Sequence, residues 1–135
     1  MMSIETNLRV AGVLMIALAL GHVVYDRYLG WKLDTKQLKL LTRQVFYVHC
    51  FFICLVLVMM GLLSLFYASE LLKPSPLSRA LLIGMAVFWG FRTAIQWFGY
   101  DSTIWRGNRL FTMMHWVYSA IWIYLTGTFS LALRA

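Results

Sequence analysis

Four long apolar blocks, separated by short polar segments, dominate the pattern of this chain. The blocks lie at about 10–25, 45–67, 80–100 and 110–133. A helix needs about 20 apolar residues to cross the hydrocarbon core of a membrane, and these blocks do not alternate as the strands of a membrane barrel do. The pattern therefore predicts an all-α, integral membrane four-helix bundle, with residues 1–135 forming a single transmembrane domain.

The first block also allows a second interpretation, a cleaved signal peptide. Residues 17–19 read Ala-Leu-Ala and resemble a small-x-small cleavage site, which would remove residues 1–19. However, the preceding segment carries Glu5 as well as Arg9 and lacks the basic excess of a signal peptide. The sequence thus favours a retained first span.

The connections between the blocks carry helix-ending and helix-starting signals. In the first connection, 26–44, the stretch DTKQLKLLTRQ predicts a short interfacial amphipathic helix that runs into the second span. Asp34 is expected to cap this helix, with Gln37 completing a capping box. The second connection, SELLKPSPLSR, reads as a helix stop followed by a serine-capped helix start. Gly107 and Asn108 predict a turn in the third.

Small residues predict close helix packing at two places. Ala86, Gly90 and Ala94 form a small-xxx-small stripe in the third block, and Ala17 and Gly21 form a shorter one in the first. Since Arg92 lies about 200° around the helix from Gly90, the small face is expected to meet one neighbour while the polar face meets another.

Composition agrees with lipid as the solvent. Hydrophobic residues make up 61% of the chain and charged residues only 13%, which excludes a soluble domain of this size. The formal net charge is +7, but the basic residues are spread over several loops and form no dense basic arm. We therefore expect the lipid bilayer as partner, and no nucleic acid.

The distribution of basic residues predicts the orientation. The first and third connections hold seven Lys and Arg residues, whereas the termini and the second connection hold four. The positive-inside rule then places connections 1 and 3 in the cytoplasm and both termini outside. The expected location is the plasma (inner) membrane.

Every histidine of the chain lies inside a predicted span, near the end that faces connections 1 and 3. These residues are His22, His49 and His115, and Arg92 and Gln96 of the third span lie toward the same end. Polar and ionisable residues in spans are costly and usually face the bundle interior. The sequence therefore predicts a polar site in one half of the bundle.

The first hypothesis for this site is a redox or metal centre. Two imidazoles could ligate a haem iron, with Arg92 paired to a propionate. Alternatively, His22, His49 and His115 together could hold a transition metal, with Asp26 as the carboxylate behind a ligand. No H-x-x-x-H or E-x-x-H spacing supports the metal.

Two other functions remain open. Arg92 and Gln96 could recognise an anionic or carbonyl-bearing ligand, such as a lipid headgroup or a quinone, in a binding or transporter-like protein. The chain could instead be an accessory subunit of a larger membrane complex, or a homo-oligomer. Each histidine also has a plainer interpretation, as a hydrogen bond between neighbouring helices, and Arg92 as a side chain that extends to the interface.

Overall fold

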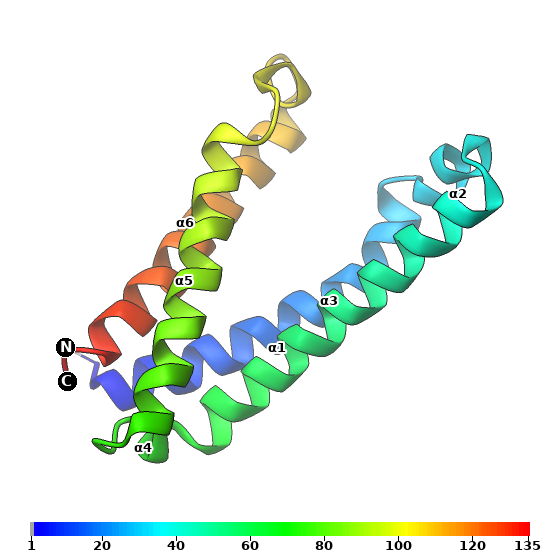
Figure 1. Cartoon of the computed structure of the whole chain (residues 1–135). Coiled ribbons are helices and arrows are strands. Elements are labelled where there is room, and N and C mark those ends of the chain that lie inside the picture. Colours follow the sequence, from blue (N-terminus) through cyan, green and yellow to red (C-terminus); the bar gives the residue numbers. More distant parts are fainter. Residues whose placement is uncertain (1) are drawn as a thin grey trace. The chain divides into compact units, whose positions relative to one another are not determined.

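The computed structural model describes residues 2–135, except for the side chains of residues 25–27. The secondary structure of this described part is entirely helical. Four long helices follow the predicted blocks (Figure 1): α1 (Ile4–Tyr28), α3 (Leu40–Phe66), α5 (Pro76–Phe98) and α6 (Arg109–Ala132). The prediction of an all-α chain is therefore confirmed.

Three of the long helices have the length and hydropathy of membrane spans. They are Ile4–Val24 within α1, Leu40–Phe66 and Pro76–Phe98. α6 has 24 residues, but its histidine, tryptophans, tyrosines and hydroxyl residues lower its mean hydropathy. Hydropathy thus supports three of the four predicted spans but does not by itself support α6.

The chain divides into two compact units. One consists of Arg9–Tyr67, and the other of Met1–Leu8 together with Ala68–Ala135. Each unit is described here by itself. The single domain expected from the sequence stays a prediction.

In the unit Arg9–Tyr67, α1 and α3 lie side by side and meet at two glycines (Figure 1). A Cβ atom added to Gly12 would lie 2.7 Å from both the carbonyl oxygen of Gly61 and the backbone nitrogen of Leu65. Only glycine permits such an approach of two helix backbones. The close contact predicted at Ala17 does not form, because that residue is exposed.

The connection between α1 and α3 contains α2 (Trp31–Asp34) and the 3-10 turn η1 (Thr35–Gln37). A short helix was expected here, but the capping box is wrong, because the Asp34 side chain caps nothing and its backbone is itself helical. The expected continuity with the second span is also wrong. Leu38 and Lys39 have extended ψ angles of 150° and 145°, so α3 begins only at Leu40.

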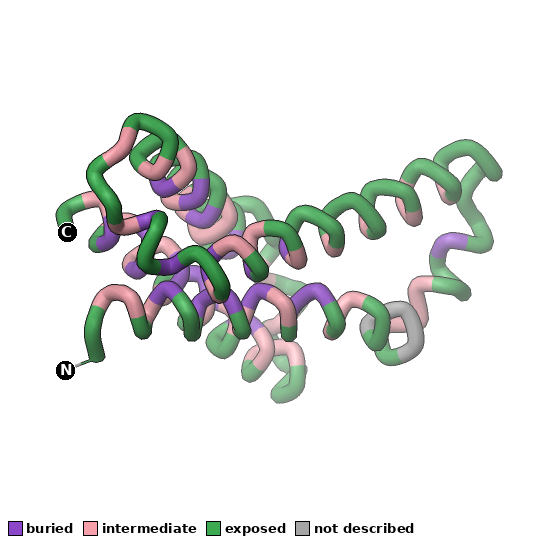
Figure 2. Tube along the Cα trace, turned by 90° about the horizontal axis from the view of Figure 1, so that it is seen from below, coloured by how far each residue is buried: buried purple, intermediate pink, exposed green. Residues whose placement is uncertain are grey.

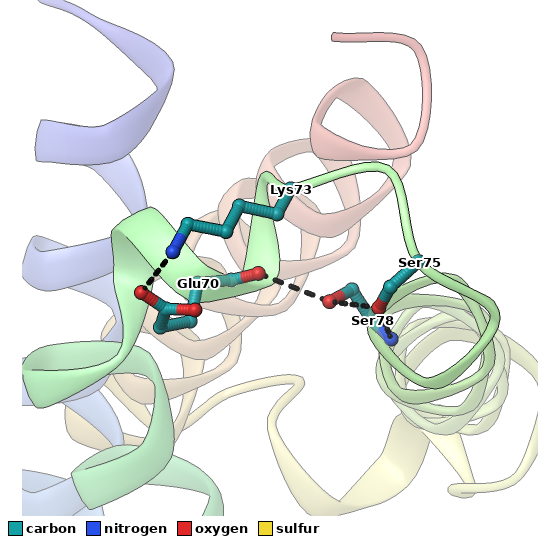
Figure 3. Close-up of polar contacts among 4 residues, drawn as sticks. All are labelled: Glu70, Lys73, Ser75 and Ser78. Atoms are coloured by element: carbon teal, nitrogen blue, oxygen red, sulfur yellow. Dashed lines mark hydrogen bonds and ion pairs between the residues drawn. The ribbon is translucent and has the colours of Figure 1, made fainter.

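The second connection stops one helix and starts the next through local hydrogen bonds (Figure 3). After α4 (Ala68–Leu71), Lys73 Nζ lies 2.6 Å from Glu70 Oε1, and Ser78 Oγ donates to the Glu70 carbonyl oxygen at 3.0 Å. Ser75 Oγ accepts from the Ser78 backbone N–H and caps α5, with Pro76 at its first turn. The predicted helix stop and start are confirmed.

The third connection joins α5 to α6 through the 3-10 turn η2 (Ser102–Ile104). Gly107 has a φ of 88°, and Asn108 Oδ1 accepts from the first backbone N–H groups of α6. This confirms the predicted turn. The Thr103 backbone N–H donates to Asp101 Oδ1 at 2.8 Å, and this hydrogen bond lowers the pKa of the Asp101 carboxyl.

Candidate functional site

The buried faces of α5 and α6 meet and bring polar side chains together. Buried residues recur three, four or seven apart along each helix, so each set forms one stripe, shown in purple in Figure 2. In α5 they are Leu82, Met85, Trp89 and Gln96, and in α6 they include His115, Ser119, Trp122, Leu125 and Phe129. Because polar residues belong to these stripes, the contact between α5 and α6 is the candidate functional site.

Gly90, in the small-residue stripe of α5, lies near α6. A Cβ atom on Gly90 would lie 4.0 Å from Thr126 Cγ2 of α6, which is an ordinary contact and not a close one. The hydroxyl of the nearby Thr93 lies 3.0 Å from that of Thr126. Gly90 and Thr93 thus lie at the edge of the contact with α6, the helix that Arg92 and Gln96 also contact, and a second neighbour for the small face stays a prediction.

A chain of hydrogen bonds links Trp122, Gln96 and His115. Trp122 Nε1 donates to Gln96 Oε1 at 3.1 Å, and Gln96 Nε2 lies 3.0 Å from His115 Nδ1. Gln96 is 6% exposed and His115 7%. The structure thus brings together two of the predicted site residues and adds Trp122, which the sequence did not single out.

Tryptophan rings surround the imidazole of His115. Trp105 stacks on it with a centroid distance of 4.2 Å and an interplanar angle of 16°. Trp97 and Trp116 meet it edge-on at 5.2 and 5.9 Å. The Ser119 hydroxyl donates to the His115 carbonyl oxygen at 2.7 Å. These contacts hold the imidazole in one position.

Arg92 lies against aromatic rings within the same cluster. Its Cζ is 4.6 Å from the centroid of Trp122 and 5.8 Å from that of Tyr100. Its Nη1 is buried and has no hydrogen-bond partner among the side chains and backbone that the structure describes. The guanidinium therefore has favourable contacts for its charge, but the described residues offer no acceptor to one of its nitrogens.

Trp89 provides a second buried donor of this kind. It is 1% exposed, and its ring stacks on Trp122 at a centroid distance of 5.3 Å. Its Nε1 is buried and finds no acceptor in the described part of the chain. Trp89 and Arg92 are three residues apart on α5, so they lie on the same side of the helix, and both contact the Trp122 ring.

His22 and His49 belong to the unit Arg9–Tyr67, and each imidazole forms a hydrogen bond within its own helix. The Nδ1 of His22 is 2.9 Å from the carbonyl oxygen of Leu18, and the Nδ1 of His49 is 2.8 Å from that of Val45. Both contacts are within the residue's own helix, four positions back. The gathering of these imidazoles with His115, Arg92 and Gln96 in one site stays a prediction.

The redox or metal hypothesis gains no support. Among the described residues, no group of three or more His, Cys, Asp or Glu side chains could hold a metal ion. The Asp26 side chain, expected behind a histidine ligand, lies outside the description. Asp101, just after α5, accepts from the Thr103 backbone N–H and is influenced by Arg106.

A shallow open depression of about 500 Å³ lies at the start of α6 and is lined by Gly107, Asn108, Arg109, Thr112 and Met113. Two of its polar side chains, those of Asn108 and Thr112, already have partners. Asn108 Oδ1 caps the helix, and Thr112 Oγ1 donates to the Trp105 carbonyl oxygen at 2.6 Å. The depression therefore does not compete with the α5–α6 cluster as a site.

No protein family, curated protein or solved structure matches this chain. Periodicity could have found two residues that the sequence interpretation missed. Trp89 is seven positions before Gln96, and Trp122 seven after His115, so each pair lies on one face of its helix.

Proposed function

We propose that the protein is an integral membrane protein in which α6 is a fourth span beside α1, α3 and α5. Its 24 residues reach about 36 Å, enough to cross the hydrocarbon core. Polar residues of α6, among them His115, Ser119 and Trp122, are buried. Since α6 packs along α5, which has the hydropathy of a span, its polar groups face protein and its exposed residues include Met113, Val117, Ile123 and Leu131.

The proposed location is the plasma (inner) membrane, with both termini outside. The excess of Lys and Arg in the first and third connections supports this orientation. Cys50 and Cys54 form no disulfide and can be replaced to give a cysteine-free background. Single cysteines at Lys36, Lys73 and Arg106 should then be labelled by a membrane-impermeant thiol reagent only at Lys73 in intact cells. Labelling at Lys36 would overturn the orientation.

The proposed function is binding of a lipid-soluble ligand that carries acceptor oxygens, such as a carboxylate, a phosphodiester or a carbonyl compound. The single observation that carries it is the pair of buried donors on α5, Arg92 Nη1 and Trp89 Nε1, which find no acceptor within the described part of the chain. Buried polar groups in native proteins nearly always have a partner, and those that do not indicate a ligand, ion or water.

The approximate free energies of burying Arg92 and Trp89 also favour a bound acceptor. A charged arginine in a span costs about 2.5–3.5 kcal/mol at the membrane centre. Contacts with Trp122 and Tyr100 can return about 0.5–2 kcal/mol each, or about 1–4 kcal/mol together, which is of the same order as this cost. The contacts do not satisfy Nη1 or Trp89 Nε1, and each unpaired buried donor costs about 1–3 kcal/mol. A ligand oxygen would remove that second cost.

The depth of Arg92 limits the ligand. Arg92 precedes the last residue of α5 by six positions, which corresponds to about 9 Å along the helix. With the end of the proposed α5 span at the headgroup layer, this depth falls in the outer part of the hydrocarbon core. An acceptor group attached to a hydrophobic chain or ring can reach it without leaving the bilayer.

Identification of co-purified compounds tests this function. Wild-type protein, Arg92→Gln and Arg79→Gln are purified in a mild detergent and extracted with organic solvent, and the extracts are compared by mass spectrometry. Arg79 lies in the first turn of the same helix and is exposed, so its variant is the matched control. An acid, phospholipid or carbonyl compound should accompany the wild type and Arg79→Gln and be depleted in Arg92→Gln. Equal extracts would refute the proposal.

The same preparations discriminate between the hypotheses. Their absorption spectrum and metal content report on the redox alternative. A haem band or a stoichiometric metal that is retained by Arg92→Gln would favour that alternative over an acceptor ligand at Arg92.

A further inference from the structure

The hydrogen-bond chain at Gln96 determines which nitrogen of His115 carries the proton. The Trp122 indole N–H can only donate, so the atom of Gln96 that faces it must be the oxygen. The amide nitrogen of Gln96 then faces His115 and donates to Nδ1. Because Nδ1 uses its lone pair to accept, the proton of the neutral imidazole lies on Nε2.

The other two histidines have the opposite arrangement. His22 and His49 place Nδ1 next to a backbone carbonyl oxygen, which can only accept. Their Nδ1 atoms must therefore carry a proton. His115 is the histidine whose Nδ1 faces a donor, and this difference follows from Gln96 and Trp122.

The Nε2–H of His115 is a donor without a partner among the described residues. The imidazole lies near the surface of the α5–α6 pair, since Trp97 and Trp116, which meet it edge-on, are 42% and 59% exposed. Trp105 covers one face of the ring. The nitrogen that remains for a ligand therefore offers a hydrogen and no lone pair.

We infer that His115 is a second recognition point for the ligand, held by Gln96 and Trp122 in the tautomer that donates from Nε2. This inference rests on the function proposed for Arg92. Arg92 Nη1, Trp89 Nε1 and His115 Nε2 are all donors, so a lipid-soluble ligand that reaches both α5 and His115 must carry two acceptor oxygens. A phospholipid meets this requirement with its phosphate and ester oxygens, and a quinone-type dicarbonyl compound meets it with its two carbonyls.

In this account Gln96 and Trp122 are positioning residues, and Nδ1 of His115 is not available to a metal. The arrangement also rejects ammonium or amine groups, which would face three donors. The imidazole acts as a fixed hydrogen-bond donor for as long as the Trp122 N–H holds the Gln96 amide in its orientation.

Nitrogen-15 NMR of delipidated full-length protein, labelled at histidine and arginine and held in a maltoside detergent, tests the tautomer without a phospholipid ligand. The spectra are recorded near pH 8.5, about two units above the ordinary histidine pKa of about 6.5, so that neutral rings dominate. The expected result is a proton on Nε2 of His115 and on Nδ1 of His22 and His49. A proton on Nδ1 of neutral His115 would overturn the inference.

Two variants and a control test the positioning role. Trp122→Phe keeps an aromatic ring but removes the N–H that orients Gln96, and Gln96→Leu removes the amide. Both should give a mixture of His115 tautomers, while Trp116→Phe, which alters only an edge-on ring contact, should not. Unchanged His22 and His49 signals show that the rest of the fold is intact. A pure Nε2–H tautomer in Gln96→Leu would refute the role of Gln96.

Addition of probes then separates this inference from the proposed function. Phosphatidylglycerol and a long-chain quinone are added separately, and the His115 Nε2–H and Arg92 guanidinium signals are followed. The inference expects both signals to move with at least one probe, and the identity of that probe gives the source of the oxygens. If only Arg92 responds, His115 is not a recognition point although the proposed function stands. If neither responds, the proposed function fails as well.

Discussion

Replacement of Gly12 by alanine tests the tightest packing contact in the unit Arg9–Tyr67. The new Cβ atom would lie 2.7 Å from the Gly61 carbonyl oxygen and the Leu65 backbone nitrogen. Both are backbone atoms of α3, so no side chain can turn away, and α1 and α3 must separate by several tenths of an ångström. Overpacking of this kind costs about 1–3 kcal/mol.

An opposing gain makes the net effect smaller. Alanine is favoured over glycine within a helix by about 0.5–1 kcal/mol. The expected result for Gly12→Ala is a net loss of about 1 kcal/mol, within a range of about 0–2.5 kcal/mol. Gly84→Ala is the matched control, because Gly84 also lies within a helix and a Cβ there meets nothing within 4 Å. That variant should be neutral or up to about 1 kcal/mol more stable.

The assay is equilibrium unfolding in mixed micelles, with a denaturing detergent as the variable and circular dichroism as the signal. The two variants should move the midpoint in opposite directions, or Gly12→Ala alone should lower it. If Gly12→Ala is as stable as Gly84→Ala, the helices do not cross at Gly12 and Gly61, and the account of this unit is wrong.

Three further predictions concern caps and hydrogen bonds. Asn108→Ala removes the cap of α6 and should cost about 1 kcal/mol in the same unfolding assay, whereas no loss would mean that Asn108 does not cap the helix. Thr93→Val combined with Thr126→Val should show a coupling energy of about 0.6 kcal/mol in a double-mutant cycle, and additive losses would contradict the bond. The pKa of the Asp101 carboxyl is lower in the folded protein than its unfolded value of about 3.8. The stabilisation of the fold by the ionised carboxylate is therefore fully present above about pH 3.8 and is lost as the pH falls through the lower, folded pKa. Hydrogen exchange at the Thr103 amide should therefore retain its protection at pH 4 and lose it in stronger acid, beyond the intrinsic change with pH, and Asp101→Ala should lack this protection throughout.

The sequence predicted the helices well because their limits are local properties. The length of each apolar block, Ser75 before Pro76, and the pair Gly107–Asn108 all act within a few residues of the helix end that they define. The error at Asp34 has the same local origin. Thr35 Oγ1 donates to the Trp31 carbonyl at 2.6 Å, and Asp34 becomes part of the short helix instead of its cap.

The packing of one helix on another could not be predicted in the same way. Ala17 and Gly12 are equally plausible contact residues from sequence, because the choice depends on how α1 is rotated against α3. The register that places Gly12 opposite Gly61 is a property of both helices together. Neither helix contains that information alone.

The candidate site shows the same limit. The sequence placed three histidines, Arg92 and Gln96 at one depth, and the structure links Gln96 to His115 and both Arg92 and Gln96 to Trp122. Depth says nothing about the direction in which a ring points. His22 and His49 bond to their own helices, and this orientation depends on backbone carbonyls that no sequence pattern marks.

The central claim is that Arg92 receives an acceptor oxygen from a lipid-soluble ligand. The most direct test is a binding titration of delipidated protein with a long-chain carboxylate and with the primary amine of the same chain length. A charge-assisted hydrogen bond is worth about 1.5–3 kcal/mol, or roughly a ten- to hundred-fold change in affinity. The account predicts that the wild type and Arg79→Gln bind the carboxylate at least ten-fold more tightly than the amine, and that Arg92→Gln loses this preference. Equal affinities for the two probes, or a preference that survives in Arg92→Gln, would contradict it.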